Sequence, residues 1–182
     1  MPRIPAVDPA SATGKAKDLL AGVQKALGAT PNLMRTMANA PSVLDGYLAF
    51  SGALRGGGLG PEAREAVALA VAGENSCGYC AAAHTSLAGK AGVAKDELAR
   101  NLAGGSADLR TAAILALARC VVATRGQVAD TDIAAARTAG LDDAAIVETV
   151  ALVALNVLTN YPNNVAQTAI DFPEVQLPRR AA

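Results

Sequence analysis

Residues 61–84, PEAREAVALAVAGENSCGYCAAAH, decide how this chain can fold. Pro61 suits the first position of a helix, and the run Val67–Ala72 is apolar on every side of that helix. A helix without a polar face has to be buried. The turn after it carries Ser76, a residue type that caps helix N-termini, so we expect a second helix to begin near Cys77. The stretch predicts two helices joined by a tight turn, the first of them in the core.

Helix signals continue on both sides of this stretch. The composition is 52% hydrophobic but only 3% aromatic, and alanine, the best helix former, is abundant. Apolar residues at helical spacing, prolines at helix starts and glycines at helix ends predict helices at about 13–27, 31–37, 41–54, 61–72, 77–90, 95–102, 107–124, 130–139, 142–158 and 162–170. We therefore expect an all-α protein of eight to ten helices, a single domain over residues 1–182 with its core at about 31–172.

Charge, termini and cysteine number narrow the functional class. Sixteen basic residues balance sixteen acidic ones and no basic run stands out, which argues against nucleic acid and anionic membranes as partners. The N-terminus lacks the apolar core of a signal peptide, and polar residues interrupt the longest apolar stretches too early for a membrane span. Three cysteines do not make a disulfide framework. We expect a cytoplasmic protein in which a close cysteine pair is catalytic, redox-active or metal-binding.

Cys77, Cys80 and His84 share one face of the second helix, because residues three and four apart on a helix are neighbours. A thiol must ionise before it attacks, and the N-terminus of a helix favours the anion. His84, the only histidine of the chain, supplies a base whose pKa is near neutral. A second cysteine can turn a sulfenic acid into a disulfide. The spacing predicts a two-cysteine redox cycle made of a thiolate, a base and a resolving thiol.

A carboxylate is expected beside the histidine. Glu65 lies in the first turn of the buried helix and leads directly into its apolar run, so we expect it to point inward, where it would orient the imidazole and tune its basicity. Glu74, three residues before Cys77, is the competing candidate, although its place in a turn favours an exposed role. The alternative for Glu65 is an ordinary first-turn glutamate that the helix dipole stabilises.

Two structural interpretations compete with the redox one. A zinc site would need four ligands, and beyond Cys77, Cys80 and His84 only Cys120 is available, in an apolar helix where it is more typical of a core residue. The other interpretation is a buried and inert cysteine pair, since free cysteines are often buried. Both cysteines lie close to the only histidine, which favours a reactive redox site over either structural interpretation. We expect neither a metal nor another cofactor.

The pentapeptide EAVAL at 65–69 is echoed by ETVAL at 148–152. At this offset Asn160 and Asn163 correspond to the two cysteines. The echo indicates either an internal pseudo-repeat, in which only one copy of a helix pair is chemically active, or a chance match in an alanine-rich chain.

The order of the site residues resembles that of the alkylhydroperoxidase D-like group of the carboxymuconolactone decarboxylase family: Arg64, Glu65, Cys77, Tyr79, Cys80 and His84. The resemblance is strong over about 59–92 and looser from 31 to 173, where the C-terminal part is similar to that of peroxidase-related members. It implies an all-helical fold that assembles into trimers or hexamers. It also implies the reduction of small hydroperoxides through the cysteine pair.

By position, the resemblance implies that Glu65 and His84 form a proton relay and that Cys77 and Cys80 are the redox pair. Electrons would come from an external dithiol, which in this family is carried by a lipoylated protein. Tyr79 stands where the best-studied members have a second histidine; it can donate a hydrogen bond and support the site, but it is a poor base at neutral pH. Members that decarboxylate the muconolactone lack the cysteine pair, so the family's name does not define the reaction expected here.

The sequence therefore predicts a thiol-dependent alkyl hydroperoxidase. We expect Cys80, next to His84, to attack the peroxide, and Cys77, exposed at the helix end, to meet the dithiol partner. Two alternatives stay open: a non-enzymatic redox sensor or adaptor that uses the same cysteine switch, and a family member that performs acid–base chemistry on a small organic acid or lactone. The alanine-rich apolar helices also predict a homo-oligomer.

Overall fold

The structure, a computed structural model, describes residues 1–178, which form nine helices and no strand. The helices are, in chain order, α1 (Gly14–Leu27), α2 (Asn32–Met37), α3 (Pro41–Leu54), α4 (Pro61–Glu74), α5 (Gly78–Lys90), α6 (Lys95–Leu102), α7 (Leu109–Thr124), α8 (Asp130–Thr138) and α9 (Asp143–Ala166). The predicted all-α fold of eight to ten helices is confirmed. The first eight predicted helices agree with α1 to α8 within about two residues at each end, which is the ordinary uncertainty of a helix boundary.

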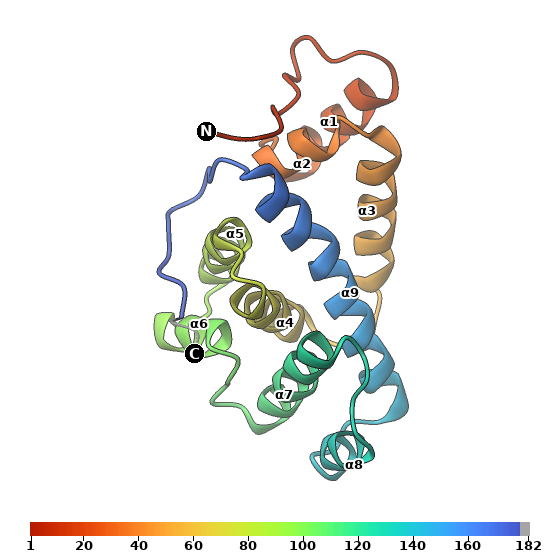
Figure 1. Ribbon diagram of the computed structural model, residues 1–182, viewed down its shortest axis with the longest axis vertical. Helices are drawn as coiled ribbons and strands as arrows, with labels where there is room; N and C mark the ends of the chain where they lie inside the picture. Colours follow the sequence, from red (N-terminus) through yellow and green to blue (C-terminus); the bar gives the residue numbers. More distant parts are fainter. Residues whose placement is uncertain (179–182) are drawn as a thin grey trace.

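Helix α4 lies at the centre of the protein and packs against α5, α6, α7 and α9 (Figure 1). Every residue from Ala66 to Ala72 is buried. The two sides of α4 belong to different hydrophobic clusters, because Leu69 packs with residues of α1, α2, α5 and α6, whereas Val67 and Val71 pack with residues of α7, α8 and α9. Burying a side chain of this size contributes roughly 1.5–3 kcal/mol. The helix has no polar face because no side of its central part meets solvent.

One predicted helix boundary is wrong. The two helices expected at 142–158 and 162–170 are a single helix, α9, which continues through Pro162 and crosses the molecule from α8 to α2 (Figure 1). A proline inside a helix removes one main-chain hydrogen bond, here the one to the carbonyl of Leu158. Helix α9 packs against α3, α4, α5 and α7 and buries nine of its residues. This packing outweighs the local preference of proline for a helix end.

The sequence predicts Ser76 as the N-cap of α5, and this prediction is wrong. The N-cap is Cys77. The backbone of Ser76 is left-handed, with a φ of 51°. Cys77 has an extended backbone, and its sulfur accepts a hydrogen bond from the N–H of Cys80 at 3.4 Å. The N–H of Cys77 donates to the carbonyl of Ala72 at 2.9 Å. The chain therefore leaves α4 and enters α5 within three residues, and a sulfur occupies the position expected for a serine oxygen.

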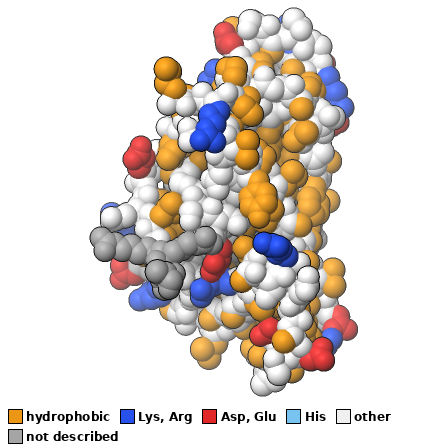
Figure 2. Space-filling model, viewed as in Figure 1, with side chains coloured by type: hydrophobic (Ala, Val, Ile, Leu, Met, Phe, Trp, Pro, Cys, Tyr) orange, Lys and Arg blue, Asp and Glu red, His pale blue; other side chains and the backbone are white. Residues whose placement is uncertain are grey.

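By length and composition alone, α9 is able to cross a membrane, contrary to the expectation that no stretch would qualify. A single helix of this kind is weak evidence for a membrane span, because the core helix of a soluble protein passes the same test. The inner face of α9 is packed against five other helices, α2, α3, α4, α5 and α7. Its outer face contributes to the hydrophobic side chains that gather over α3 and α9 (Figure 2).

Candidate active site

Cys77 and Cys80 lie at the N-terminal end of α5, and both are unpaired thiols. Their side chains are buried, with 0% and 2% of their surface exposed. Cys77 belongs to the hydrophobic cluster that also contains Leu69 and Ala72 of α4. The expected exposure of Cys77 at the helix end is therefore wrong, because the tight turn sets the N-terminus of α5 against α4 instead of leaving it in solvent.

Glu65 of α4 and His84 of α5 are brought together. Nδ1 of His84 lies 2.8 Å from Oε2 of Glu65, and 23% and 32% of the two side chains remain exposed. Burial disfavours the charged form of each group, but the opposite charge and the hydrogen bond outweigh it, so the pKa of His84 is raised above its ordinary value and the pKa of Glu65 is lowered. The pair therefore favours an imidazolium beside a carboxylate.

Glu74, the competing carboxylate, has a different partner. It forms an ion pair with Arg119 of α7, in which Oε1 lies 2.5 Å from Nε. Glu74 sits at the C-terminal end of α4, whereas Glu65 sits in its first half. The two glutamates are thus separated by most of the helix, and Glu65 is the one that meets the imidazole.

The sulfur of Cys80 is surrounded by polar groups. Nδ2 of Asn163 donates to it at 3.2 Å, and Oγ1 of Thr159 lies 3.9 Å away. A hydrogen bond from the thiol of Cys77 is the largest influence on Cys80; with the positive charge of His84 and the two contacts from α9 it overcomes burial and lowers the pKa of Cys80 to about 6. The pKa of Cys77 is raised, because its proton is held in the hydrogen bond to Cys80 and because it is buried. The hydrogen bond between the two sulfurs therefore favours the thiolate on Cys80 and the thiol on Cys77.

The site therefore has a sequence of charges in which the carboxylate of Glu65, the imidazolium of His84 and the thiolate of Cys80 alternate in sign. Among the described residues no hydrogen bond joins His84 to either sulfur. The imidazolium acts on Cys80 through its charge. Each charge stabilises its neighbour, which is how a buried site keeps a thiol ionised.

Tyr79, the predicted supporting residue, holds the C-terminal segment against α2 and α5. Its hydroxyl accepts a hydrogen bond from the N–H of Leu33 at 3.0 Å and interacts with the carboxylate of Asp171. Its ring meets the ring of Phe172 edge to face, with the centroids 5.8 Å apart. Burial raises the pKa of Tyr79, and the carboxylate of Asp171 raises it further. The hydroxyl is engaged in these structural contacts at the edge of the site.

Helix α3 adds Tyr47, for which the sequence held no signal. Its side chain packs against the hydrophobic cluster that contains both cysteines, and it interacts electrostatically with Cys80 and Glu65. Burial raises the pKa of Tyr47, which keeps the hydroxyl neutral at pH 7. Tyr47 reaches the site because α3 packs against α9. The spacing of residues along one helix cannot predict such a contact between distant helices.

The face of α9 toward the core carries an unusual number of buried polar residues: Thr149, Asn156, Thr159, Asn160 and Asn163. Oδ1 of Asn160 accepts a hydrogen bond from Asn75 at 3.0 Å. Nδ2 of Asn160 and Oδ1 of Asn163 have no partner within the described residues. Asn163, which the pentapeptide echo sets opposite Cys80, does contact Cys80. The internal pseudo-repeat itself stays a prediction.

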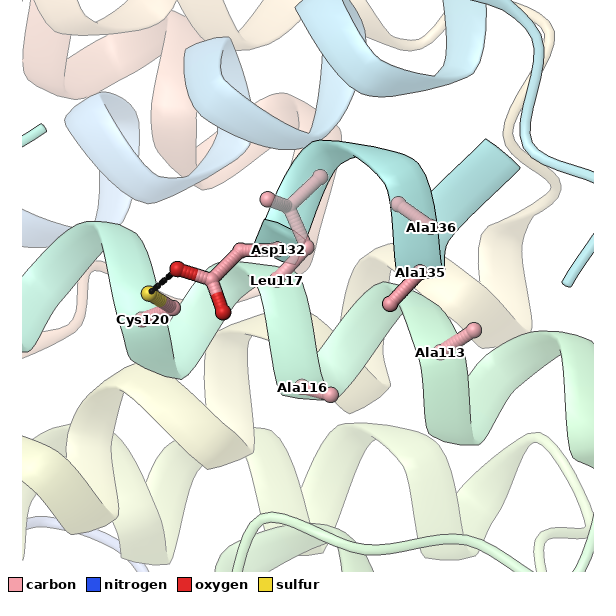
Figure 3. A pocket seen from close by; sticks show the side chains of 7 residues that line it. All are labelled: Ala113, Ala116, Leu117, Cys120, Asp132, Ala135 and Ala136. Atoms are coloured by element: carbon pink, nitrogen blue, oxygen red, sulfur yellow. Dashed lines mark hydrogen bonds between the residues drawn. The ribbon is translucent and has the colours of Figure 1, made fainter. Parts of the chain in front are cut away.

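Cys120 lies apart from this site, between α7 and α8. Its thiol donates to Oδ2 of Asp132 at 3.2 Å, at the wall of a small hollow of about 130 Å³ that is otherwise lined mainly by alanines (Figure 3). The hydrogen bond to the carboxylate raises the pKa of Cys120, and partial burial adds to this. Cys120 is therefore a poor nucleophile. Within residues 1–178 no group of three or more histidine, cysteine or acidic side chains is arranged to hold a metal ion.

A known protein family covers the part of the chain that holds this site. Residues 41–123 match the model of the carboxymuconolactone decarboxylase family. This segment contains Glu65, both cysteines of the pair and His84. No curated protein sequence matches the chain.

Several solved structures share the fold. An alkylhydroperoxidase D core protein, described as an uncharacterized peroxidase-related protein from Ralstonia eutropha JMP134, is 26% identical over 93% of this chain and 92% of its own, with a TM-score of 0.80. A peroxidase-related protein from Silicibacter sp. TM1040 is 19% identical over 92% of this chain and 91% of its own, also with a TM-score of 0.80. The debrominase Bmp8, solved with 2,3,4-tribromopyrrole, is 16% identical over 92% of this chain and 91% of its own, with a TM-score of 0.77. The predicted resemblance is therefore confirmed: residues 41–123 match the carboxymuconolactone decarboxylase family, and the chain has the fold of an alkylhydroperoxidase D core.

Proposed function

We propose that this protein is a thiol-dependent oxidoreductase that reduces small hydroperoxides through Cys77 and Cys80, with electrons from an external dithiol. The observation that carries the proposal is the environment of Cys80, a buried sulfur with a pKa of about 6 beside the Glu65–His84 pair. A thiolate that is present at neutral pH is the form that attacks a peroxide oxygen. The match to an alkylhydroperoxidase D core protein supports the same chemistry.

The first half-reaction oxidises Cys80. Its thiolate attacks the terminal oxygen of R–O–O–H; the S–O bond forms as the O–O bond breaks, which leaves a sulfenic acid on Cys80 and an alkoxide R–O⁻. The raised pKa of His84 favours its protonated form, and the imidazolium gives its proton to the alkoxide. Glu65 stabilises the imidazolium until that transfer. His84 thus acts here as a general acid, a step later than the proton abstraction expected from the sequence.

The second half-reaction forms and then reopens a disulfide. The thiol of Cys77 already donates to the sulfur of Cys80 and is positioned to attack it once it is a sulfenic acid. The S–S bond forms, and the hydroxyl of the sulfenic acid leaves with the Cys77 proton as water. An external dithiol, in the simplest case a lipoyl group, then reduces the Cys77–Cys80 disulfide by thiol–disulfide exchange. The whole cycle needs no metal and no bound cofactor.

Peroxide consumption by the purified protein tests this function. The assay supplies tert-butyl hydroperoxide and excess dihydrolipoamide. We expect steady turnover in wild type, none in Cys80→Ser, a single turnover in Cys77→Ser and a reduced rate in His84→Gln. Cys120→Ser is the matched control and is expected to keep wild-type turnover, because Cys120 lies between α7 and α8.

The other outcomes distinguish the alternative functions. If wild type forms the Cys77–Cys80 disulfide on oxidation but does not turn over with dihydrolipoamide or other dithiols, the redox sensor or adaptor replaces the peroxidase. If the protein acts on an organic acid or lactone and that activity survives Cys80→Ser, acid–base chemistry replaces it.

A further inference from the structure

Asn163 is the closest polar neighbour that α9 supplies to the reacting sulfur. Its Nδ2 lies 3.2 Å from Sγ of Cys80, and the two side chains are 3% and 2% exposed. A hydrogen bond from a neutral donor to a buried anion is stabilising, because burial removes most of the hydration that the anion would have in water. The backbone of Asn163 is fixed within α9, so its amide group is held beside the sulfur.

The second group from α9 near Cys80 plays a different part. The hydroxyl hydrogen of Thr159 is donated to the carbonyl of Asn156 at 2.9 Å. Oγ1 of Thr159 lies 3.9 Å from the sulfur, farther than the amide nitrogen of Asn163, so its contact with Cys80 is the weaker of the two. An amide N–H can only donate, which suits a thiolate. Of the two α9 groups, Asn163 makes the closer contact with the sulfur, and its N–H is a donor that an ionised Cys80 can accept.

The other end of the Asn163 side chain has no partner. Oδ1 of Asn163 is buried and accepts no hydrogen bond within the described residues. An unpartnered buried carbonyl destabilises the folded protein, so a residue chosen for stability alone would not be an asparagine. The amide makes one side-chain hydrogen bond here, and that bond goes to Cys80. The cost is understandable if the bond to sulfur serves the chemistry.

We propose that Asn163 is a catalytic residue of this site, whose amide N–H holds the thiolate of Cys80 for attack on the substrate. The proposal deepens the function given above and rests on Cys80 as the attacking sulfur. An aspartate at this position would have nearly the same shape but would remove the donor and place a second negative charge against the thiolate. An alanine would remove the donor without adding a charge.

The test measures the titration of Cys80 in a protein where it is the only thiol. The double variant Cys77→Ser, Cys120→Ser leaves Cys80 alone among the three cysteines, and a serine hydroxyl at 77 can still donate to it. Asn163→Asp and Asn163→Ala are introduced into this background. Asn164→Asp is the matched control, since it makes the same change one residue further on, at an exposed position that bonds to the carbonyl of Asn75. Circular dichroism checks that each variant is folded.

The readout is the midpoint of the pH dependence of alkylation by iodoacetamide, checked by thiolate absorbance. The plateau rate is not used, because Asn163 also lines a hollow of about 290 Å³ at the N-terminal end of α5, and a smaller side chain could ease access to Cys80. We expect the midpoint to rise by one pH unit or more in Asn163→Asp and by less in Asn163→Ala. It should change little in Asn164→Asp. Folded Asn163 variants with the midpoint of the parent protein would overturn the proposal.

This titration uses no peroxide, so it separates the two proposals. If wild type fails to reduce peroxides but the midpoint depends on Asn163, the peroxidase function is wrong, while the contact between the amide and the thiolate stands for whatever electrophile Cys80 attacks. If wild type turns over, Asn163→Asp in the otherwise natural chain should shift the acid limb of kcat/KM upward by the same amount. Its activity should then recover at higher pH. A uniform loss of activity at every pH would contradict a role in holding the thiolate.

Discussion

The reactivity of Cys80 depends on two groups that titrate in opposite directions. With a pKa of about 6, Cys80 loses its thiolate as the pH falls through that value. His84 has a raised pKa, so its imidazolium persists above its ordinary range and is lost only as the pH rises through the raised value. We therefore expect a bell-shaped dependence of kcat/KM with an acid limb near pH 6 and an alkaline limb above the ordinary pKa of histidine. Initial rates with tert-butyl hydroperoxide across this range measure both limbs, and an acid limb near the pKa of an ordinary thiol would contradict the picture.

The alkaline limb depends on Glu65. Replacing Glu65 with glutamine removes the charge that raises the pKa of His84, so burial should then lower it. Because His84 is the only histidine, its ring protons give a single set of resonances, and NMR can follow its pKa directly. We expect Glu65→Gln to lower that pKa, to move the alkaline limb with it, and to reduce kcat/KM at pH 8 on the order of 10–100-fold.

Glu74→Gln is the control for this change. It breaks the ion pair with Arg119, at the far end of the same helix, and should leave the pKa of His84 unchanged. An equal effect of both glutamine variants would mean that the loss reflects damage to α4 rather than loss of the carboxylate beside the imidazole.

At the residue scale, the contacts that could be predicted are those within the α4–α5 pair. Glu65 leads into the buried run of α4, which predicts that its side chain points inward. The spacing of Cys77, Cys80 and His84 predicts that these three side chains share one face of α5. Tyr47 could not be found in this way, because its contact arises from the packing of distant helices. The pentapeptide echo aligns Asn163 with Cys80 in sequence, but a sequence alignment does not predict that the two residues are in contact.

At the element scale, the position of α4 depends on close approach at its end. A Cβ added to Gly73 would lie 2.2 Å from the carbonyl oxygen of Leu102, an atom of the backbone at the end of α6. Backbone cannot rotate away as a side chain can, so α4 and α6 would have to separate. We expect Gly73→Ala to destabilise the protein by about 1–3 kcal/mol. Urea unfolding, with the midpoint and slope both fitted, measures the change.

Gly22→Ala provides the comparison for Gly73→Ala. Gly22 lies in α1, and a Cβ there meets nothing within 4 Å. In an open helical position alanine is favoured over glycine by roughly 1 kcal/mol, so this variant should be as stable as wild type or more stable. Stabilisation by both substitutions would show that α4 and α6 are free to move apart.

The elements that could not be predicted are those in which packing overrides local preference. Pro162 predicts the start of a new helix, because proline normally ends a preceding helix. In α9 it costs one main-chain hydrogen bond, against nine buried residues along the helix. Ser76 is the residue type expected to cap α5, but it adopts a left-handed conformation in the short connection, and Cys77 is the N-cap instead. The N-cap of α5 therefore lies one residue later than the sequence predicts, and Cys77, which was expected to be exposed, is buried.

At the scale of the whole molecule, the outer face of α9 is the feature that a single chain does not explain. Its exposed large hydrophobic residues are Val147, Val150, Leu158, Tyr161 and Val165. They recur at intervals that keep them on one stripe of the helix, and from residue 144 to 165 no exposed position of α9 carries a charge. The outer face of a helix in a monomer is normally charged or polar. Large exposed apolar surfaces of this kind mark sites of association.

The sequence also predicts a homo-oligomer, and we expect this stripe of α9 to lie against a second copy of the chain. Sedimentation equilibrium should give a mass that is a multiple of the 18.2 kDa of one chain, a trimer or hexamer if the family resemblance extends to assembly. Val150→Lys with Leu158→Lys places two charges on the stripe and should dissociate the assembly, because an unpaired charge buried in an interface is strongly unfavourable. Leu109→Lys changes an apolar residue that is 86% exposed at the start of α7, and it should leave the mass unchanged. A wild-type protein that sediments as a monomer at micromolar concentration would refute the assembly, and an unchanged mass in the α9 variant would place the interface away from this stripe.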